Sequence, residues 1–262
     1  MNSHQNQRVV VTGAAGVMGR WISEAFAREG AALLLTDRRA EDLEKHAAEM
    51  DQHTGQVDIL TADLTSEDGV AALLGKAQDL WGSPDVLVNN AGVYPHGPVL
   101  DTEVADVRSI FEINVMAPFA LSRGVAAMMV AQDVQGSIVN IGSGAGHAPA
   151  TGGAPYAASK AALHMFTRAF SLELARFNIR VNTVEPGFAP GSEVSHLDDE
   201  YVTRMTSTIP LGRSSGPGDA PEAVLFLCSS RASFITGASL AVDGGRTAGT
   251  MRPMPTRTLR GS

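Results

Sequence analysis

Three side chains in one short stretch of the chain have the types and spacing for proton transfer. Tyr156 and Lys160 lie four residues apart in an alanine-rich segment that we expect to be helical from about Pro155, so both lie on one helix face. Ser143 follows an apolar run at 138–141 of the length that a buried strand needs. Because open α/β sheets hold ligands at strand ends and helix starts, we expect the three groups to converge.

The chemistry of these groups depends on the pKa of the phenol. A free tyrosine titrates near pH 10, and a cation within a few ångströms lowers that pKa by roughly 1–3 units. Acid–base catalysis is most efficient when the pKa lies near the working pH. We therefore expect Lys160 to lower the pKa of Tyr156, and Ser143 to steady a substrate oxygen. The same three residues could also occur by chance, with Ser143 capping a loop, so their context decides.

The chain alternates between apolar strand segments and helical segments. Such alternation indicates βαβ units and a parallel sheet. The fold class predicted is α/β, a Rossmann-type doubly wound sheet of about seven strands with helices on both faces in three layers. The expected strands are 8–12, 31–36, 57–62, 86–88, 138–141, 179–184 and 239–242. The expected helices are 20–29, 40–50, one after Asp63 that ends at about 80, 102–111, 117–133, 155–176 and 219–229.

No repeat or linker divides the chain, so we expect one domain over residues 1–245. Residues 188–218 lack clear periodicity apart from a short helix near 193–206. We expect about 188–210 to form a substrate loop that acts as a mobile lid. The tail 246–262 carries four arginines and no acid, and is expected to be disordered or to pack on a neighbouring subunit.

Composition excludes several classes of protein. A net charge of −8 argues against a nucleic-acid partner. The single cysteine, Cys228, precludes an internal disulfide, and no Cys/His cluster has metal-ligand spacing, so we expect no metal. The polar start resembles no signal peptide, and the longest apolar run, 117–131, is interrupted and short of a membrane span. A cytoplasmic protein without a membrane partner is expected.

A glycine loop is the first sign of a cofactor. Gly13, Gly16 and Gly19 lie between a predicted strand and a predicted helix, where glycines let a pyrophosphate approach a helix N-terminus. Asp37, at the end of the second strand, is placed to bind a ribose diol and would repel a 2′-phosphate. This favours NAD over NADP, although Arg38 and Arg39 weaken the preference. A plain tight turn, and a helix cap at Asp37, are the structural alternatives.

With these pieces in place, the chain resembles the short-chain dehydrogenase/reductase family in its compact, single-domain form. The resemblance runs from about Arg8 to Gly245 and places Ser143 the usual 13 residues before Tyr156. It depends on nine strings in the family's order: VTGAAGVMG, LLLTDR, ADLT, NNAG, FEINV, IVNIGS, YAASK, IRVNTVEPG and VDGG.

The resemblance implies a role for each matched residue. Tyr156 would transfer the proton, Lys160 would lower the pKa of Tyr156 and contact the nicotinamide ribose, and Ser143 would hydrogen-bond the reacting oxygen. Asn114 would hold a water that relays protons from Lys160. By itself, Asn114 would be read as a helix break and Asp63 as a helix N-cap. The implied cofactor contacts, besides Tyr156 and Lys160, are Gly13, Gly16, Val17, Met18, Gly19, Asp37, Asp63, Leu64, Asn90, Ala91, Gly92, Pro186, Gly187 and Ala189.

Two positions depart from the family pattern. The second glycine of the loop is expected at position 17, where this chain has Val17 and carries Gly16 instead, so we expect altered loop geometry with binding retained. A threonine that anchors the carboxamide in many relatives is replaced by Gly191. The resemblance therefore implies no threonine side chain at this position to anchor the nicotinamide.

The expected substrate is a secondary alcohol or ketone of modest polarity. Its pocket would include Tyr94 and His147 beside Ser143 and Tyr156, although a histidine on a surface loop need not touch substrate. The leading function is an NAD(H)-dependent oxidoreductase acting on CH–OH groups. The alternatives are an NADP-dependent 3-oxoacyl reductase and a non-catalytic nucleotide-sensing protein. Relatives commonly form homotetramers, so we expect a tetramer or a dimer paired through the helices at 117–131 and 155–176.

Overall fold

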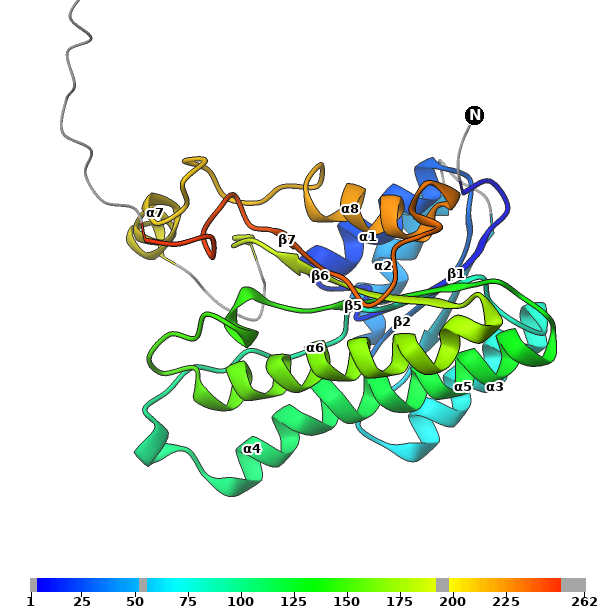
Figure 1. Cartoon of the computed structure of the whole chain (residues 1–262), viewed down its shortest axis with the longest axis horizontal. Coiled ribbons are helices and arrows are strands. Elements are labelled where there is room, and N and C mark those ends of the chain that lie inside the picture. The colour runs from blue at the N-terminus through cyan, green and yellow to red at the C-terminus, as the bar shows by residue number, and fades with distance from the viewer. Residues whose placement is uncertain (1–3, 52–55, 192–197, 251–262) are drawn as a thin grey trace, which may run out of the picture.

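The computed structural model describes residues 4–51, 56–191 and 198–250. Within them, seven strands form one parallel sheet in the order β3-β2-β1-β4-β5-β6-β7. Helices cover both faces (Figure 1), which confirms the Rossmann-type fold with three layers. The strands are β1 (Arg8–Thr12), β2 (Ala32–Asp37), β3 (Val57–Thr61), β4 (Val86–Asn89), β5 (Ser137–Ile141), β6 (Arg180–Pro186) and β7 (Ser239–Val242).

The helices divide between the two faces of the sheet. In Figure 1, α1, α2 and α8 lie on one face, while α3, α4, α5 and α6 lie on the other. Their bounds are α1 (Val17–Arg28), α2 (Ala40–Asp51), α3 (Glu67–Trp81), α4 (Val104–Phe111), α5 (Ala117–Ala131), α6 (Ala154–Leu174), α7 (Asp199–Ser207) and α8 (Ala220–Cys228). Short 3-10 turns are Val99–Asp101, Gly144–Gly146 (η3), Ala175–Phe177 and Ser230–Ala232.

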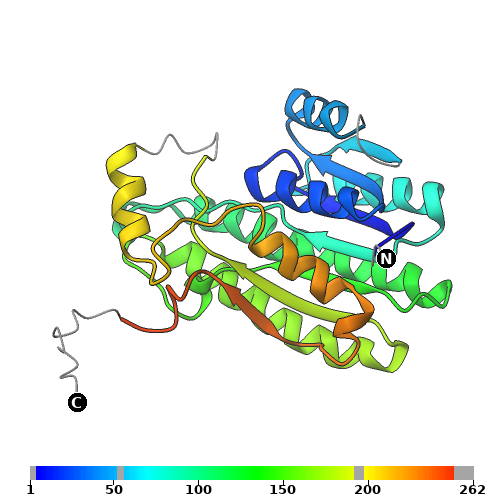
Figure 2. The same ribbon diagram turned by 90° about the horizontal axis from the view of Figure 1, so that it is seen from above.

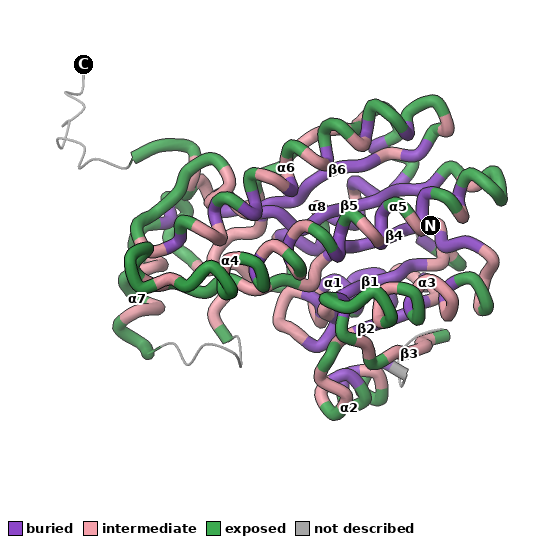
Figure 3. The backbone as a smooth tube through the Cα atoms, turned by 90° about the horizontal axis from the view of Figure 1, so that it is seen from below, coloured by how far each residue is buried: buried purple, intermediate pink, exposed green. Residues whose placement is uncertain are grey.

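Two hydrophobic cores account for the continuous apolar strands. Val9 and Val11 point into a core with Phe26 of α1 and Val224 of α8, whereas Val10 points into the opposite core with helices α3 and α5. A strand buried on both faces needs apolar side chains at every position rather than at alternate ones. In Figure 3 the tube is accordingly coloured as buried along most of the inner strands.

The order of the strands fixes where a ligand can bind. β1 pairs with β2 on one side and with β4 on the other, so the chain reverses its direction of travel across the sheet at this point. A crevice forms outside the carboxyl ends of the strands at such a switch point. The glycine loop after β1 and the segment after β4 therefore lie beside each other.

One helical stretch runs unbroken where two separate helices were predicted. A π-helical turn, Glu112–Met116, joins α4 directly to α5. A π turn accommodates an extra residue without ending the helix and often marks a functional site. It carries the buried side chain of Asn114, so the expected break at 112–116 is a bulge in the helix.

By length and composition alone, the combined helix Val104–Ala131 is long and apolar enough to cross a membrane. The sequence contains no uninterrupted apolar run of that length. In this structure its inner face packs on the sheet through Leu121, Val125 and Met129. The same length and apolar composition are found in core helices.

Other boundaries differ slightly from the prediction. Helix α1 begins at Val17, three residues earlier than expected, because Gly16 already has the extended backbone of an N-cap. The short helix expected near 193–206 is α7, which lies on the same side of the molecule as the start of α6 (Figures 1 and 2). The middle of the expected lid, 192–197, and most of the expected tail, 251–262, are outside the described residues.

Candidate active site

The structure brings the predicted serine and tyrosine together. Ser143 is the N-cap of η3 directly after β5, and its Oγ accepts a hydrogen bond from Ala145 N at 3.2 Å. Tyr156 lies in the first turn of α6, partly buried, and its phenol is close enough to the Ser143 side chain for Ser143 to lower the pKa of the phenol. The spacing of 13 residues is thus bridged by a loop that returns the chain to the end of β5.

Lys160 lies one turn further along α6 and is 6% exposed. Its Nζ donates a hydrogen bond of 2.8 Å to the carbonyl of Ile141 and lies 5.9 Å from the centre of the Tyr156 ring. Burial lowers the pKa of the Lys160 ammonium from 10.5 to about 8. The amine therefore holds its proton only weakly above neutral pH.

The structure corrects the expected electrostatics of Tyr156. Burial raises the pKa of the phenol above its usual value of 10.0, and the hydrogen bond with Ser143 only partly opposes this effect. The net pKa therefore lies above its usual value and not below it as predicted, although Lys160 Nζ, which donates to the Ile141 carbonyl, lies 5.9 Å from the ring centre. In this structure Tyr156 is a protonated acid near neutral pH.

Asn114 braces the loop that follows β4. Its Oδ1 accepts from Val93 N, and its Nδ2 donates to Val93 O, each at 2.9 Å. Nδ2 also donates to Ser159 Oγ at 3.0 Å, in the turn of α6 between Tyr156 and Lys160. The side chain amide therefore ties together two parts of the site, and its role in a water relay stays a prediction.

The glycine loop is shaped to admit a dinucleotide. Gly13 has φ of +63°, and a Cβ there would lie 2.8 Å from Ala91 Cα. A Cβ at Gly19 would overlap the carbonyl oxygen of Gly13. No side chain caps the N-terminus of α1 within the described residues, so its first amides and partial positive charge face the loop. These features fit a pyrophosphate.

The departure at Val17 is explained by where the helix begins. Gly16 is extended, with φ of −79°, and Val17 and Met18 are the first residues of α1. Neither position 16 nor position 17 has a positive φ. The loop therefore turns at Gly13 and packs closely at Gly19, and a valine is accommodated between them.

Asp37 lies at the end of β2, facing the same loop. Its Oδ2 accepts from Ala15 N at 3.1 Å, while Oδ1 accepts from Arg39 N at 3.1 Å. The side chain is only 9% exposed and also pairs with the Arg39 guanidinium at 3.4 Å, which pairs in turn with Asp42 at 2.9 Å. The carboxylate is thus fixed beside the glycine loop rather than serving as the cap of α2.

The predicted adenine contacts, Asp63 and Leu64, follow β3. Asp63 is exposed, and hydrogen bonds from the Thr65 amide and hydroxyl lower the pKa of its carboxyl. Leu64 is buried. The N-cap of α3 is Ser66, which accepts from Gly69 N at 3.0 Å, and not Asp63.

The NNAG segment crosses the switch point of the sheet. Asn90 Nδ2 donates to the carbonyls of Thr12 and Gly13, at 2.9 and 3.0 Å. Thr12 Oγ1 accepts from the amides of Asn90 and Ala91, both at 3.0 Å. A Cβ at Gly92 would lie 2.9 Å from Asn114 Oδ1 and 3.7 Å from Lys160 Nζ, so this glycine lets the chain pass close to both side chains.

The residues predicted to hold the carboxamide follow β6. Gly187 N donates to Val242 O at 2.8 Å, and a Cβ at Gly187 would lie 2.9 Å from Asp243 Cα. Pro186 and Ala189 are partly exposed, and Gly191 adopts φ of +99°. A cavity of about 470 Å³ opens beside this segment; its lining includes Gly187, Phe188, Ile209, Arg213, Asp219 and Thr247.

The predicted substrate residues separate into two groups. Tyr94 is 45% exposed, and its ring centre lies 6.4 Å from that of Tyr156, as does the ring of His96. His147 instead lies 3.6 Å from Glu185 Oε2. The aromatic pair therefore flanks the reactive phenol, while His147 belongs to a separate cluster described below.

Comparison with known proteins identifies the family. Residues 13–247 match the model described as "Enoyl-(Acyl carrier protein) reductase". Cyclopentanol dehydrogenase of Comamonas sp. (strain NCIMB 9872) is 39% identical over 92% of this chain and 96% of its own length. The chain belongs to the short-chain dehydrogenase/reductase family.

Two further relatives show the range of this family. The 3-oxoacyl-(acyl-carrier-protein) reductase FabG of Thermotoga maritima is 34% identical over 90% of this chain and 96% of its own. The crystal structure of L-sorbose reductase from Gluconobacter frateurii, complexed with NADPH and L-sorbose, superposes with a TM-score of 0.89 and 28% identity over 95% and 100% of the two chains. This family member is therefore a nucleotide-binding oxidoreductase acting on CH–OH groups.

A buried polar network beneath the site was missed in the sequence. Asn89 and Asn140 are neighbours in the register of β4 and β5, and Asn89 Nδ2 donates to Asn140 Oδ1 at 2.8 Å. Asn140 Nδ2 donates to Thr167 Oγ1, also at 2.8 Å, which links the sheet to α6. The signal was an asparagine within each of two otherwise apolar strands, a polar residue where burial is costly unless it is hydrogen-bonded.

Proposed function

We propose that the protein is an NAD(H)-dependent oxidoreductase that interconverts a secondary alcohol and its ketone, with Tyr156 as the acid and base. The observation that carries this proposal is the convergence of Ser143, Tyr156 and Lys160 at the carboxyl end of β5, close to the glycine loop. A bound nicotinamide would supply the hydride acceptor or donor.

The three side chains divide the proton chemistry between them. In ketone reduction, the Tyr156 hydroxyl would donate its proton to the oxygen as charge develops there, and its raised pKa keeps that proton in place at neutral pH. Ser143 would donate a hydrogen bond to the same oxygen. In oxidation, Tyr156 must first ionise, and a charged Lys160 close by would favour its phenolate.

Asp37 supports NAD over NADP. Its carboxylate is held by Ala15 N and Arg39 at the point where the adenosine ribose would lie, so a 2′-phosphate would meet a fixed negative charge. The Arg39 guanidinium pairs with both Asp37 and Asp42, so we expect the Asp37 carboxylate rather than Arg39 to decide the preference between NAD and NADP.

The substrate class we propose is a cyclic or short aliphatic secondary alcohol. The rings of Tyr94 and His96 each have their centre 6.4 Å from the centre of the Tyr156 ring, where they could pack against an apolar substrate. The similarity to cyclopentanol dehydrogenase favours the same class.

A 3-oxoacyl reductase using NADP is the second candidate, favoured by the similarity to FabG. The fixed Asp37 carboxylate opposes it through the cofactor. NADPH-dependent reduction of a 3-oxoacyl thioester that exceeds cyclopentanol oxidation in kcat/KM would select this candidate.

The test combines cofactor binding with turnover. NADH and NADPH are titrated separately by fluorescence, and cyclopentanol and related alcohols are then screened for NADH production. We expect tighter binding of NADH, and we expect Tyr156→Phe to lower kcat by roughly 100- to 10,000-fold with the cofactor Kd unchanged. Turnover by Tyr156→Phe at the wild-type rate would refute the proposed role of the phenol.

A further inference from the structure

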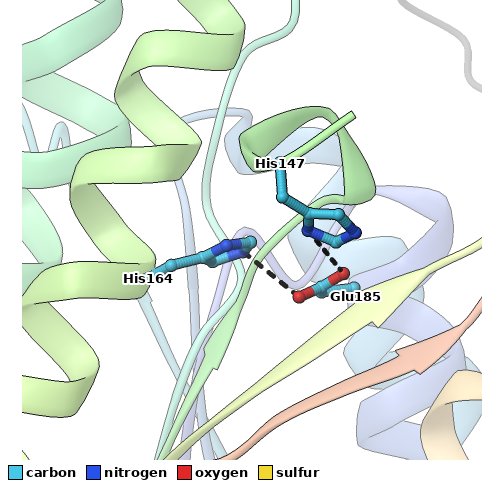
Figure 4. Close-up of side chains that lie close together, drawn as sticks. All are labelled: His147, His164 and Glu185. Atoms are coloured by element: carbon cyan, nitrogen blue, oxygen red, sulfur yellow. Dashed lines mark ion pairs between the residues drawn. The ribbon is translucent and has the colours of Figure 1, made fainter. Parts of the chain in front are cut away.

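Three side chains of metal-ligand type lie close together next to the loop that follows Ser143. His147 follows η3, His164 lies on α6 and Glu185 lies on β6, so none is close to another in sequence (Figure 4). One ligand atom from each lies within 4.8 Å of the other two. Local spacing in the sequence could not reveal this group, which is why no metal was predicted.

The carboxylate of Glu185 needs a positive partner. It is 2% exposed, and its Oε2 has no hydrogen-bond donor among the described residues. His147 Nδ1 and His164 Nε2 each approach one of its oxygens at 3.6 Å, which is too long for a hydrogen bond. Burying a carboxylate is costly unless it is paired, hydrogen-bonded or bound to a metal.

His164 presents a lone pair to this carboxylate. Its Nε2 accepts the Ser143 amide at the long distance of 3.5 Å, which requires the unprotonated nitrogen. In that tautomer Nε2 and Glu185 Oε1 are both acceptors facing each other across 3.6 Å. A cation there would bind the carboxylate and the Nε2 lone pair, in place of the long contact with the Ser143 amide.

We infer that His147, His164 and Glu185 bind a divalent transition-metal ion, with zinc as the best match. Two histidines and one glutamate form a known zinc donor set that leaves a fourth position open. Metal bonds of about 2.0–2.2 Å place neighbouring tetrahedral donors roughly 3.3–3.5 Å apart. His147 Nδ1 lies 3.6 Å from Oε2 and His164 Nε2 lies 3.6 Å from Oε1, so a small turn of the carboxylate would bring one oxygen within reach of an ion held by both rings. His147 is 49% exposed, so its ring can rotate to close the site and the ion can enter from solvent.

Such an ion would hold the loop that follows Ser143 in place. The ligands belong to the loop after Ser143, to the helix that carries Tyr156 and Lys160, and to the strand that leads to Gly187. The loop already rests on the imidazole, because a Cβ at Gly146 would lie 2.8 Å from His164 Cε1. The ion acts as a clip between three elements and takes no part in proton or hydride transfer.

The test measures metal binding without cofactor or substrate, so it is independent of the proposed function. Full-length protein without a histidine tag is treated with a chelator, dialysed and titrated with zinc chloride by calorimetry. Cobalt(II) is added in parallel to follow its visible absorption, which reports the coordination geometry. We expect one ion per chain and a four-coordinate cobalt spectrum.

The variants locate the ion. We expect His147→Gln and Glu185→Gln each to weaken zinc binding by about 100-fold or more, since losing even an outer partner of a ligand costs roughly 10- to 100-fold. Glu222→Gln is the matched control, because it removes an exposed carboxylate paired only with exposed Arg28. His147 is exposed, so its variant keeps the test valid if Glu185→Gln does not fold.

Two outcomes would overturn the inference. One is the absence of saturable, one-to-one binding to the wild-type protein. The other is one-to-one binding that both variants retain, which would place the ion elsewhere. Either result would leave the cluster as two histidines paired with a buried glutamate.

Discussion

Tyr156 and Lys160 are neighbours whose burial shifts their pKa values in opposite directions. Burial raises the pKa of the phenol and lowers that of the ammonium to about 8, because each neutral form is favoured away from water. The pair was predicted from sequence to form a phenolate held by a cation. In the structure, the neutral phenol of Tyr156 lies beside the Lys160 ammonium, whose proton is weakly held. The rate of alcohol oxidation should therefore depend steeply on pH.

That dependence can be measured directly. With saturating cofactor, we expect kcat/KM for alcohol oxidation to rise about tenfold per unit between about pH 7 and about pH 9, because the fraction of ionised base rises tenfold per unit below its pKa. Ketone reduction should instead be flat or fall over this range. An oxidation rate that is already level below pH 7 would show that Lys160 does ionise the phenol.

Lys160 should also make stability depend on pH. The unfolded chain keeps the lysine proton up to its ordinary pKa of 10.5, whereas the folded protein loses it near 8. Raising the pH between these values therefore favours the folded state. The free energy of unfolding of wild type, relative to Lys160→Met, should rise by about 2 kcal/mol from about pH 7.5 to about pH 9.5, at about 1.4 kcal/mol per pKa unit.

Urea denaturation of both proteins at the two pH values provides the measurement. The difference between wild type and Lys160→Met cancels the titration of all other groups that the variant leaves unchanged. Parallel pH curves for the two proteins would mean that the amine is solvated in solution. Its hydrogen bond to the Ile141 carbonyl would then be weaker than the structure indicates.

At the scale of elements, the loop between β1 and α1 depends on contact between backbones. A Cβ at Gly19 would overlap Gly13 O and lie 2.8 Å from Ala14 Cα, whereas a Cβ at Gly16 would lie 3.4 Å from Gly13 O and meet nothing else within 4 Å. We expect Gly19→Ala to destabilise the protein by about 1–3 kcal/mol through overpacking. Gly16→Ala should change stability by less than about 0.5 kcal/mol.

Thermal unfolding of the two alanine variants checks this difference. Gly16 is the N-cap of α1 and Gly19 lies in its first turn, where alanine has the higher helix propensity, so a loss of stability confined to Gly19→Ala would come from the contact. Equal losses of stability would mean that α1 shifts to admit a Cβ at position 19. The glycine spacing would then matter for the ligand rather than for the packing of the helix.

The sequence predicted most elements because the inner strands are largely apolar and alternate with helical segments. It predicted Ser143, Tyr156 and Lys160 to be together because strand ends and helix starts meet at one edge of a parallel sheet. It predicted a break at 112–116 and not the π turn that carries Asn114, since the same residues can end a helix or widen it by one residue. Nor could it join His164 to Glu185, because their contact depends on how α6 lies across β6.

At the scale of the whole molecule, helices α5 and α6 present an apolar face to solvent. They lie side by side in Figure 1, and the rings of Phe119 and Phe166 are 5.6 Å apart. Several large apolar side chains on these helices and the adjoining π turn are exposed: Met116 (50%), Phe119 (42%), Met165 (60%) and Leu172 (78%). Such a patch on a soluble protein marks an interaction surface, and we propose that a second copy of the chain covers it.

A charge placed on this face should separate the subunits. We expect Leu172→Glu to lower the mass measured by sedimentation velocity to that of a smaller assembly, because pairing would bury the new carboxylate without a partner. Ala48→Glu, which adds the same charge to an exposed position on α2, should leave the mass unchanged. A wild-type protein that sediments as a stable monomer, or a Leu172→Glu variant with the wild-type mass, would show that this face does not join the subunits.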